Sequence, residues 1–346
     1  MQYERFEHWK KKIFLVDMKE DKPIGFFSSL AQHTLEKYIP QGKKILIIGG
    51  KKWLAAGVMC QDCGYIPKCQ HCDIPIAYHQ DHAAKTFGIC HICKTAYSAV
   101  SNCPSCQGHN VTLFGMGLQK IEKTIADQFP SCAILMIDAE KAASLPKLER
   151  LADDIQKAQC IIATSLLQIP PSNRKPDIVI VLRADSMLSI PDWKVAEHCY
   201  HMLQNTIAKN DCPIIIQAYT PWHYAINAAC KIDDAGFWQE ENTYREQYVY
   251  PPYGEMAIIL YRHEIEETMF TRVNKLYQEL LFLQEKDGFA WEIFATPPLI
   301  YKMYDKYRYN IVLKGTSLCP FLEKAFVQLK VRERGFKIDW LPENIV

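Results

Sequence analysis

The sequence predicts an α/β protein in which a parallel sheet carries an inserted metal-binding module and is followed by a smaller α/β segment. Short runs rich in Ile and Val alternate with helical patterns, as in KILIIGG (44–50) and DIVIVL (177–182). Runs this apolar are typical of parallel strands that are buried on both faces. Eight of the fourteen cysteines gather between residues 60 and 106, a concentration that a packed core does not require.

The chain has 346 residues, 49% of them hydrophobic, and a formal net charge of +1. At roughly 100–200 residues per domain, this length indicates two or three domains. The balance of charge argues against a uniformly basic nucleic-acid-binding coat, so any phosphate-binding surface must be local. No apolar run reaches the ~18 residues that span a bilayer, and the first residues, MQYERFEHWKKK, are too polar for a signal peptide. We therefore expect a cytoplasmic protein that does not enter a membrane.

Residues 1–59 and 111–250 are predicted to form one doubly wound sheet with helices on both faces. Its strands are expected at five apolar runs, 44–50, 133–138, 160–164, 177–182 and 213–219. The segment GLQKIEKTIADQF has apolar residues at spacings of three and four, namely Leu118, Ile121, Ile125 and Phe129. This spacing predicts an amphipathic helix whose apolar face packs in the core.

The cysteine-rich segment, residues 60–110, contains four C-x-x-C pairs: Cys60/Cys63, Cys69/Cys72, Cys90/Cys93 and Cys103/Cys106. Two residues between ligands form a tight turn that aims both sulfurs at one point, as tetrahedral zinc requires. A disulfide framework is disfavoured in a reducing compartment, and a thioredoxin-like motif would use one pair. The pairs therefore predict two four-cysteine sites and two Zn2+ ions, with iron as the alternative that four thiolates allow.

The sequence leaves open which pairs share a metal, because four pairs can be matched in three ways. Matching the first pair with the second leaves only the short link GYIPK, which would be very tight. We favour the nested arrangement, in which the two inner pairs bind one ion and the two outer pairs bind the other. Eight thiolates against two Zn2+ leave a net charge of about −4, which favours a structural role, protein contacts or base stacking over phosphate binding.

The last segment, residues 251–346, is predicted to be a ferredoxin-like domain with the element order βαββαβ. Its elements are expected at 256–263, 265–286, WEIFATPPLIYK, RYNIVLKG, 317–333 and FKIDWL, and the turn-rich YVYPPYG marks its boundary. Within it, YKMYDKYRY (301–309) interleaves basic residues with tyrosines, the mixture that combines phosphate attraction with base stacking. The predicted DNA contacts are Lys302, Tyr304, Lys306, Tyr307 and Arg308. The alternative is a solvated strand edge with two tyrosines packed inward.

Nucleotide-binding motifs are missing from the sequence. There is no G-x-x-x-x-G-K-[ST] phosphate loop, because GGKKWLAAG carries its lysines in the wrong place, and no acidic Walker B run follows a strand. No catalytic residue and no nucleotide-binding residue can therefore be assigned.

The combination of motifs resembles the second half of the bacterial primosomal protein N′ (PriA) family of replication-restart helicases, over residues 14–340. The resemblance is carried by the eight-cysteine spacing together with GMGLQKIEK, SIPDWKVAEH, FWQEE, Arg245, YPPY and YKMYDKYRY. It implies two zinc ions in the nested pairing, a second RecA-like helicase lobe, and a terminal domain that helps to bind branched DNA. It also implies branched or single-stranded DNA and primosome proteins as partners.

The sequence departs from that family at positions that contact ATP. Where the family has a Gly-Thr-Gln loop followed by Lys-Gly-His, this chain has Ala163-Thr164-Ser165 and then Ile169-Pro170-Pro171. Proline removes a backbone donor from that loop. The segment that supplies the arginine finger in the family has no arginine here; it is NTIAKNDC (205–212). An arginine finger contributes ~10³–10⁵ in rate, so we predict a zinc- and DNA-binding protein without its own ATPase or helicase activity.

Two alternatives remain open from the sequence. The chain could be part of a split ATP-dependent DNA helicase whose Walker A and B lobe comes from a separate chain, with Asp185 and Lys209 as remnants of the cleft. It could also be a zinc-stabilised adaptor that contacts only protein.

Overall fold

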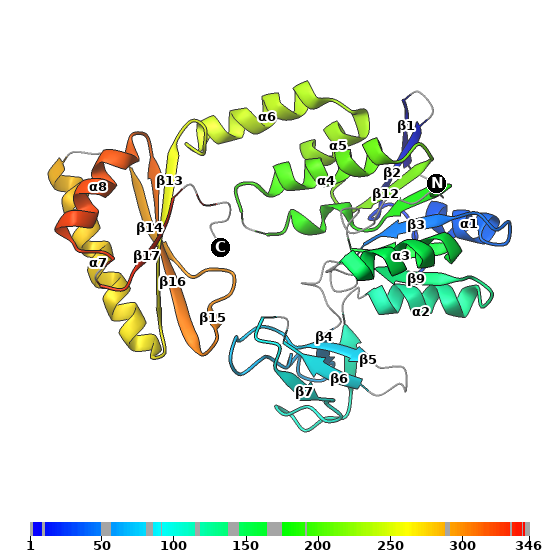
Figure 1. The fold of residues 1–346 in the computed structure, drawn as a ribbon, viewed down its shortest axis with the longest axis horizontal. Helices are drawn as coiled ribbons and strands as arrows, with labels where there is room; N and C mark the ends of the chain where they lie inside the picture. Colours follow the sequence, from blue (N-terminus) through cyan, green and yellow to red (C-terminus); the bar gives the residue numbers. More distant parts are fainter. Residues whose placement is uncertain are drawn as a thin grey trace. The chain divides into compact units, whose positions relative to one another are not determined.

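Figure 1 shows the computed structural model of the protein. The structure describes residues 3–8, 11–49, 57–80, 86–90, 92–114, 118–137, 145–164, 175–190, 192–287, 291–332, 334–340 and 342. The chain divides into two compact units. Unit 1 consists of Met1–Ala56, Gly115–Ile190 and Val195–Trp238, and unit 2 of Gly57–Phe114, Pro191–Lys194 and Gln239–Val346. A compact unit can hold more than one domain, so the three-domain division stays a prediction.

Unit 1 is built on a seven-stranded sheet with the order β1-β2-β12-β11-β3-β10-β9. Its strands are β1 (Tyr3–His8), β2 (Lys11–Asp17), β3 (Ile45–Ile48), β9 (Ile134–Ile137), β10 (Cys160–Ala163), β11 (Ile178–Val181) and β12 (Ile214–Ala218). Every neighbouring pair from β2 to β9 is parallel, and only the edge strand β1 is antiparallel. The predicted parallel sheet is therefore confirmed, and all five predicted apolar runs are strands in it.

The strands of this sheet are buried on both faces. Along β3, Ile45 and Ile47 belong to one apolar cluster, whereas Leu46 and Ile48 belong to another. The first cluster includes residues of α1 (Ser29–Tyr38) and α2 (Leu118–Gln128). The second includes residues of α3 (Leu145–Lys157), α4 (Val195–Lys209) and α5 (Tyr224–Lys231). Helices on both faces explain why the strands are continuously apolar.

The predicted amphipathic helix is α2. Ile121 and Ile125 are fully buried, Leu118 is buried, and Phe129 packs against the same cluster just beyond the helix end. The apolar spacing of the sequence was therefore sufficient to place this helix on the sheet.

Unit 2 contains three further sheets, all of them antiparallel. The cysteine-rich segment folds into the pair β4 (Gly57–Cys60) and β8 (Val111–Phe114), and the sheet β5 (Ala77–Gln80), β6 (Thr86–Ile89) and β7 (Ala96–Ser98). The C-terminal sheet has the order β14-β16-β13-β17, with β15 paired to β16. Its strands are β13 (Glu255–His263), β14 (Glu292–Thr296), β15 (Lys302–Met303), β16 (Lys306–Gly315) and β17 (Lys337–Trp340).

Helices α7 (Glu266–Asp287) and α8 (Leu318–Gln328) lie on one face of the C-terminal sheet (Figure 1). Met269, Val273, Leu276 and Leu280 of α7 are buried against it, as the predicted helical spacing requires.

One predicted strand, WEIFATPPLIYK, is interrupted in the structure: β14 ends at Thr296, and β15 begins only at Lys302. Pro297 and Pro298 explain the break, because proline cannot donate to a strand ladder. Among the described residues, no helix is long and apolar enough to span a bilayer.

Trp193 contacts the C-terminal end of α6 (Asp234–Gln247), the helix that begins in unit 1 and ends in unit 2. The Arg245 guanidinium donates to Glu241 Oε1 through Nε (2.8 Å) and Nη2 (2.7 Å), and it lies 5.0 Å from the centre of the Trp193 ring. Trp193 also stacks on Tyr250, at 5.8 Å between ring centres. These residues come from IPDW, FWQEE, Arg245 and YPPY, so the distant sequence motifs meet in one structural cluster.

Glu241→Ala is expected to destabilise unit 2 strongly. The side chains of Glu241 and Arg245 are 3% and 9% exposed, so the substitution leaves a buried charge without this carboxylate. The expected loss is about 3–5 kcal/mol in the free energy of unfolding, measured by denaturant titration. The matched control is Glu240→Ala, at the exposed neighbouring position, where a change within about 0.5 kcal/mol is expected. Similar losses for both variants would contradict the importance of this ion pair.

Candidate metal centres

All four C-x-x-C pairs adopt the same backbone turn. In each, the amide of the first cysteine donates to the carbonyl five residues later, and its carbonyl accepts from the amide four residues later, at 2.8–3.0 Å. The residue directly after the second cysteine has a positive φ in every turn; these residues are Gly64, Asp73, Lys94 and Gln107. The repeated hydrogen bonds hold both sulfurs of a pair on one side of the turn, which is the local geometry that a shared metal needs.

The outer centre brings together the first and last pairs. The Sγ atoms of Cys60, Cys63, Cys103 and Cys106 all lie within 4.8 Å of one another. The Cys60–Cys106 and Cys63–Cys103 sulfur distances are both 3.6 Å. Pairing of β4 with β8 places Cys60 opposite Val111, and this pairing is what brings residues far apart in the sequence into one group.

The inner centre brings together the second and third pairs and is more buried. The Sγ atoms of Cys69, Cys72, Cys90 and Cys93 lie within 4.8 Å of one another, and the Cys69–Cys93 sulfur distance is 3.6 Å. The Tyr97 hydroxyl donates to Cys69 Sγ at 3.0 Å, and Thr95 Oγ1 lies 3.1 Å from Cys93 Sγ. The structure thus groups the eight sulfurs in the nested arrangement favoured from the sequence.

The thiols of the inner centre have strongly divergent acidities. Burial raises the pKa of the Cys90 thiol to about 12. Burial acts in the same direction on Cys93, but hydrogen bonds with Thr95, Cys90 and Cys69 together outweigh it and lower the pKa of that thiol to about 6. Four sulfurs this close cannot all ionise without a compensating cation, since like charges at short range repel.

The geometry of both groups fits a tetrahedral metal ion. Metal–sulfur bonds of about 2.3 Å place neighbouring ligand atoms of a tetrahedron about 3.8 Å apart. The observed sulfur separations of 3.6 Å are close to that value. Each four-cysteine group could therefore hold one ion of a thiophilic metal, which would supply the positive charge that the four sulfurs lack.

The predicted DNA-binding residues all have partners within unit 2. Lys302 Nζ donates to the Gln70 carbonyl at 2.9 Å, and the Tyr304 hydroxyl donates to the Ile92 carbonyl at 3.3 Å. Lys306 pairs with Glu264 at 3.6 Å, Tyr307 packs against the C-terminal core, and Arg308 Nη1 donates to the Ile300 carbonyl at 3.3 Å. Because each has an intramolecular contact, their role in DNA binding stays a prediction.

A surface that the sequence reasoning missed lies at the carboxyl end of the parallel sheet. Trp222 is 61% exposed, and Lys19 Nζ lies 4.7 Å from the centre of its ring. Tyr219 is also exposed, with the Arg183 guanidinium 5.7 Å from its ring. These four residues, the cationic–aromatic surface, follow the adjacent strands β2, β11 and β12. Two aromatic residues directly after a buried strand, in IIIQAYTPW, were the available signal.

Asp185 fixes the loop that carries this surface. Its Oδ2 accepts hydrogen bonds from the Tyr219 amide (2.7 Å), the Thr220 amide (2.8 Å) and Thr220 Oγ1 (3.1 Å). The carboxylate therefore has a structural role in positioning the aromatic residues. Lys209, the other expected cleft remnant, is exposed in the last turn of α4. The loop with Ile169-Pro170-Pro171 and Ser165 lies outside the described residues.

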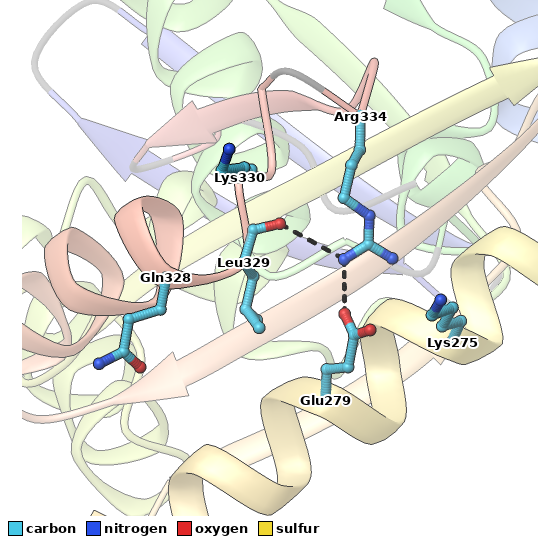
Figure 2. Close-up of a pocket in the computed structure, with 6 residues that line it drawn as sticks. All are labelled: Lys275, Glu279, Gln328, Leu329, Lys330 and Arg334. Atoms are coloured by element: carbon cyan, nitrogen blue, oxygen red, sulfur yellow. Dashed lines mark hydrogen bonds and ion pairs between the residues drawn. The ribbon is translucent and has the colours of Figure 1, made fainter.

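A separate cavity of about 470 Å³ lies between α7 and the segment after α8 in the C-terminal part of unit 2. Figure 2 shows the Arg334 guanidinium donating to Glu279 and to the Leu329 carbonyl. Lys275 and Lys330 also line it, which makes the cavity basic. It contains no cysteine and is distinct from both four-cysteine groups.

Comparison with known proteins shows a consistent set of relatives, although no family model matches the chain. It is 30% identical over 335 residues to the replication restart protein PriA of Bacillus subtilis, covering 92% of this chain and 41% of that protein. Identity to the protein of the same name from Thermotoga maritima is 28% over 321 residues, covering 90% and 42%. Identity to the replication restart protein PriA of Borreliella burgdorferi is 25% over 350 residues, covering 96% of this chain and 51% of that protein.

The resemblance indicated by the sequence motifs is thereby confirmed. The chain is a diverged homologue of the PriA replication restart proteins over about nine tenths of its length. It spans about two fifths to one half of the length of these relatives.

Gly64→Ala is expected to weaken metal retention at the outer centre. Gly64 has φ of 74°, and an added Cβ would meet no atom within 4 Å, so the cost is conformational rather than steric. A left-handed conformation costs an L-residue roughly 1–2 kcal/mol, which corresponds to a loss of about five-fold or more in metal affinity. The measurement is competition with a chelator. The control is Gln107→Ala in the partner turn, where φ is 60° and an L-residue already pays this cost; equal effects would contradict the explanation.

Proposed function

We propose that this chain is a PriA-like replication-restart protein that binds two zinc ions and DNA and has no ATPase or helicase activity of its own. The observation that carries the proposal is homology to PriA proteins over nearly the whole chain, combined with the eight cysteines gathered into two four-sulfur groups. The relatives are bacterial and act, by name, in replication restart, so the proposed location is the cytoplasm. DNA and other primosome proteins are the proposed partners.

Zinc is the proposed metal at both centres. Its preference for four thiolates in a closed tetrahedral site agrees with the sulfur separations and with the turn that each pair forms. Closed sites of this kind stabilise a fold instead of carrying out chemistry, because they leave no open coordination position. We therefore assign the ions a structural role in unit 2.

The fold supports a finer assignment of the two parts. The parallel order of the sheet in unit 1, with helices on both faces, supports a RecA-like lobe corresponding to the second lobe of a helicase. The strand order β14-β16-β13-β17, with α7 and α8 on one face, supports a ferredoxin-like C-terminal domain.

The proposed lack of ATPase activity rests on the segment 205–212. Its only basic residue is Lys209, a point charge that cannot form the bidentate contacts of an arginine finger. Asp185 is already occupied by three hydrogen bonds from the β12–α5 loop. Neither residue therefore supports a cleft completed by a Walker-containing partner chain, and the split helicase remains the alternative that an ATPase assay with DNA would reveal.

The cationic–aromatic surface is the proposed DNA contact in unit 1. Exposed aromatic rings stack on bases, and the neighbouring cations attract the backbone phosphates. Ligands of parallel α/β sheets bind at the carboxyl ends of the strands, where this surface lies. The hairpin residues predicted from the sequence are proposed as a second contact.

Purified protein is expected to contain two zinc ions per chain. Cys63→Ser should remove the ion of the outer centre and Cys93→Ser that of the inner centre, so each variant retains one ion and the double variant none. The measurement is elemental analysis of protein prepared under reducing conditions. Cys319→Ser is the control, because this exposed cysteine lies in α8, away from either group, and should leave both ions bound. A single-cysteine variant that loses both ions would contradict two independent centres.

Trp222→Ala is expected to weaken binding to single-stranded or forked DNA. Loss of one base-stacking contact costs about 1–3 kcal/mol, so the dissociation constant should rise by about five-fold or more. Lys19→Ala should instead reduce the salt dependence of binding by about one unit of slope. Fluorescence anisotropy at several salt concentrations measures both.

The control for this experiment is Phe282→Ala, which removes a 65% exposed aromatic residue from α7 and should leave DNA affinity unchanged. Wild-type protein that binds no fork DNA even at low salt would favour the protein-only adaptor. DNA-stimulated ATP hydrolysis by the same sample would contradict the proposed absence of motor activity.

A further inference from the structure

The hairpin of β15 and β16 has an unusual two-residue turn. Lys302 pairs with Tyr307 and Met303 with Lys306, so Tyr304 and Asp305 alone form the turn. Both have positive φ, 50° and 62°, as type I′ turns require. Asn and Gly are the usual residues there, and a tyrosine in this conformation costs roughly 1–2 kcal/mol. Contacts at the tip of the hairpin must offset that cost.

Those contacts are made with the inner metal centre. The Asp305 amide donates to the His71 carbonyl at 2.9 Å, and the Asp305 carboxylate lies 2.8 Å from His71 Nδ1. Lys302 Nζ donates to the Gln70 carbonyl at 2.9 Å. Gln70 and His71 are the two residues between the ligands Cys69 and Cys72. The hairpin therefore binds the backbone of one metal-binding turn.

Tyr304 extends the contact to a ligand atom and to the second inner turn. Its backbone amide donates to the Cys72 sulfur. Its side-chain hydroxyl donates to the carbonyl of Ile92, which lies between the ligands Cys90 and Cys93. One residue of the C-terminal segment thus contacts both turns that hold the inner centre.

We propose that the Tyr304–Asp305 turn is an outer part of the inner metal centre, so that metal binding there and docking of the C-terminal hairpin stabilise each other. A backbone donor to a thiolate is charge-assisted and holds the ligand in its binding orientation. Coupling of this kind is reciprocal: the free energy by which metal binding stabilises hairpin docking equals that by which docking stabilises metal binding. This inference rests on the proposed zinc loading and goes beyond it by naming residues distant in the sequence that retain the metal.

The outer centre provides an internal reference. It is braced from within its own module, where the Asn110 side chain donates to Asp62 at 3.2 Å and the Gln61 amide donates to the Asn110 carbonyl at 2.9 Å. A change in the hairpin should therefore alter one centre and leave the other as it was.

The first test measures zinc release to an excess of chelator. Asp305→Gly removes the carboxylate that contacts His71, at a position where glycine accepts the positive φ without strain. Lys302→Ala removes the hydrogen bond to the Gln70 carbonyl. Each should accelerate release from the inner centre about ten-fold, the lower end of the effect of outer-shell partners, with outer-centre release unchanged. Zinc release from each centre is identified with the variants Cys93→Ser, which lacks the inner ion, and Cys63→Ser, which lacks the outer ion. The matched control, Lys306→Ala, removes a lysine of the same hairpin that pairs with Glu264 instead, and should be neutral.

The second test follows hydrogen exchange of the Tyr304 and Asp305 amides, which donate to Cys72 and His71. Protection should fall in Cys93→Ser and persist in Cys63→Ser. Wild-type protein that binds two zinc ions, with equal release rates in all hairpin variants, would overturn this inference alone. Wild-type protein without zinc would overturn the proposed function and this inference together.

Discussion

The packing of four sulfur atoms around one point, twice, is the constraint on which unit 2 depends. Sulfurs held 3.6 Å apart cannot carry their charges without a cation, and the apolar packing around the turns that present them is limited to a small cluster that includes Cys69, Cys72 and Cys90. The three-stranded sheet and the β4–β8 pair are short, so the module has little apolar core of its own. Metal binding and folding of this segment are therefore expected to be one process.

The C-terminal part contacts this module through directed polar contacts of its β15–β16 hairpin. Its own core lies between the antiparallel sheet and helices α7 and α8. On the other face of that sheet, Trp193, Arg245 and Tyr250 form a stacked cluster around a buried ion pair. The motifs that carry the resemblance to PriA proteins therefore include residues that hold the structure together.

The sequence predicted the regular elements of the fold well. The apolar runs became the parallel strands, and the spacing of Ile121 and Ile125 placed α2 on the sheet. It failed where local chemistry interrupts a pattern: Pro297 and Pro298 end β14 within an apolar run that otherwise continues. It could not show the contacts of Lys302 with Gln70 and of Tyr304 with Ile92, because these join segments more than two hundred residues apart, and the role of both residues in DNA binding stays a prediction.

By itself, the sequence determined that eight cysteines form four pairs whose sulfurs could share a metal ion, since C-x-x-C spacing fixes the direction of two sulfurs through local backbone geometry. It also indicated the homology to PriA proteins, through motifs spread along the chain. Only the tertiary structure decided which pairs meet, because that depends on the pairing of β4 with β8. It likewise decided that Lys19, Arg183, Tyr219 and Trp222 form one surface, because parallel strands bring their carboxyl ends together whatever their distance in the sequence.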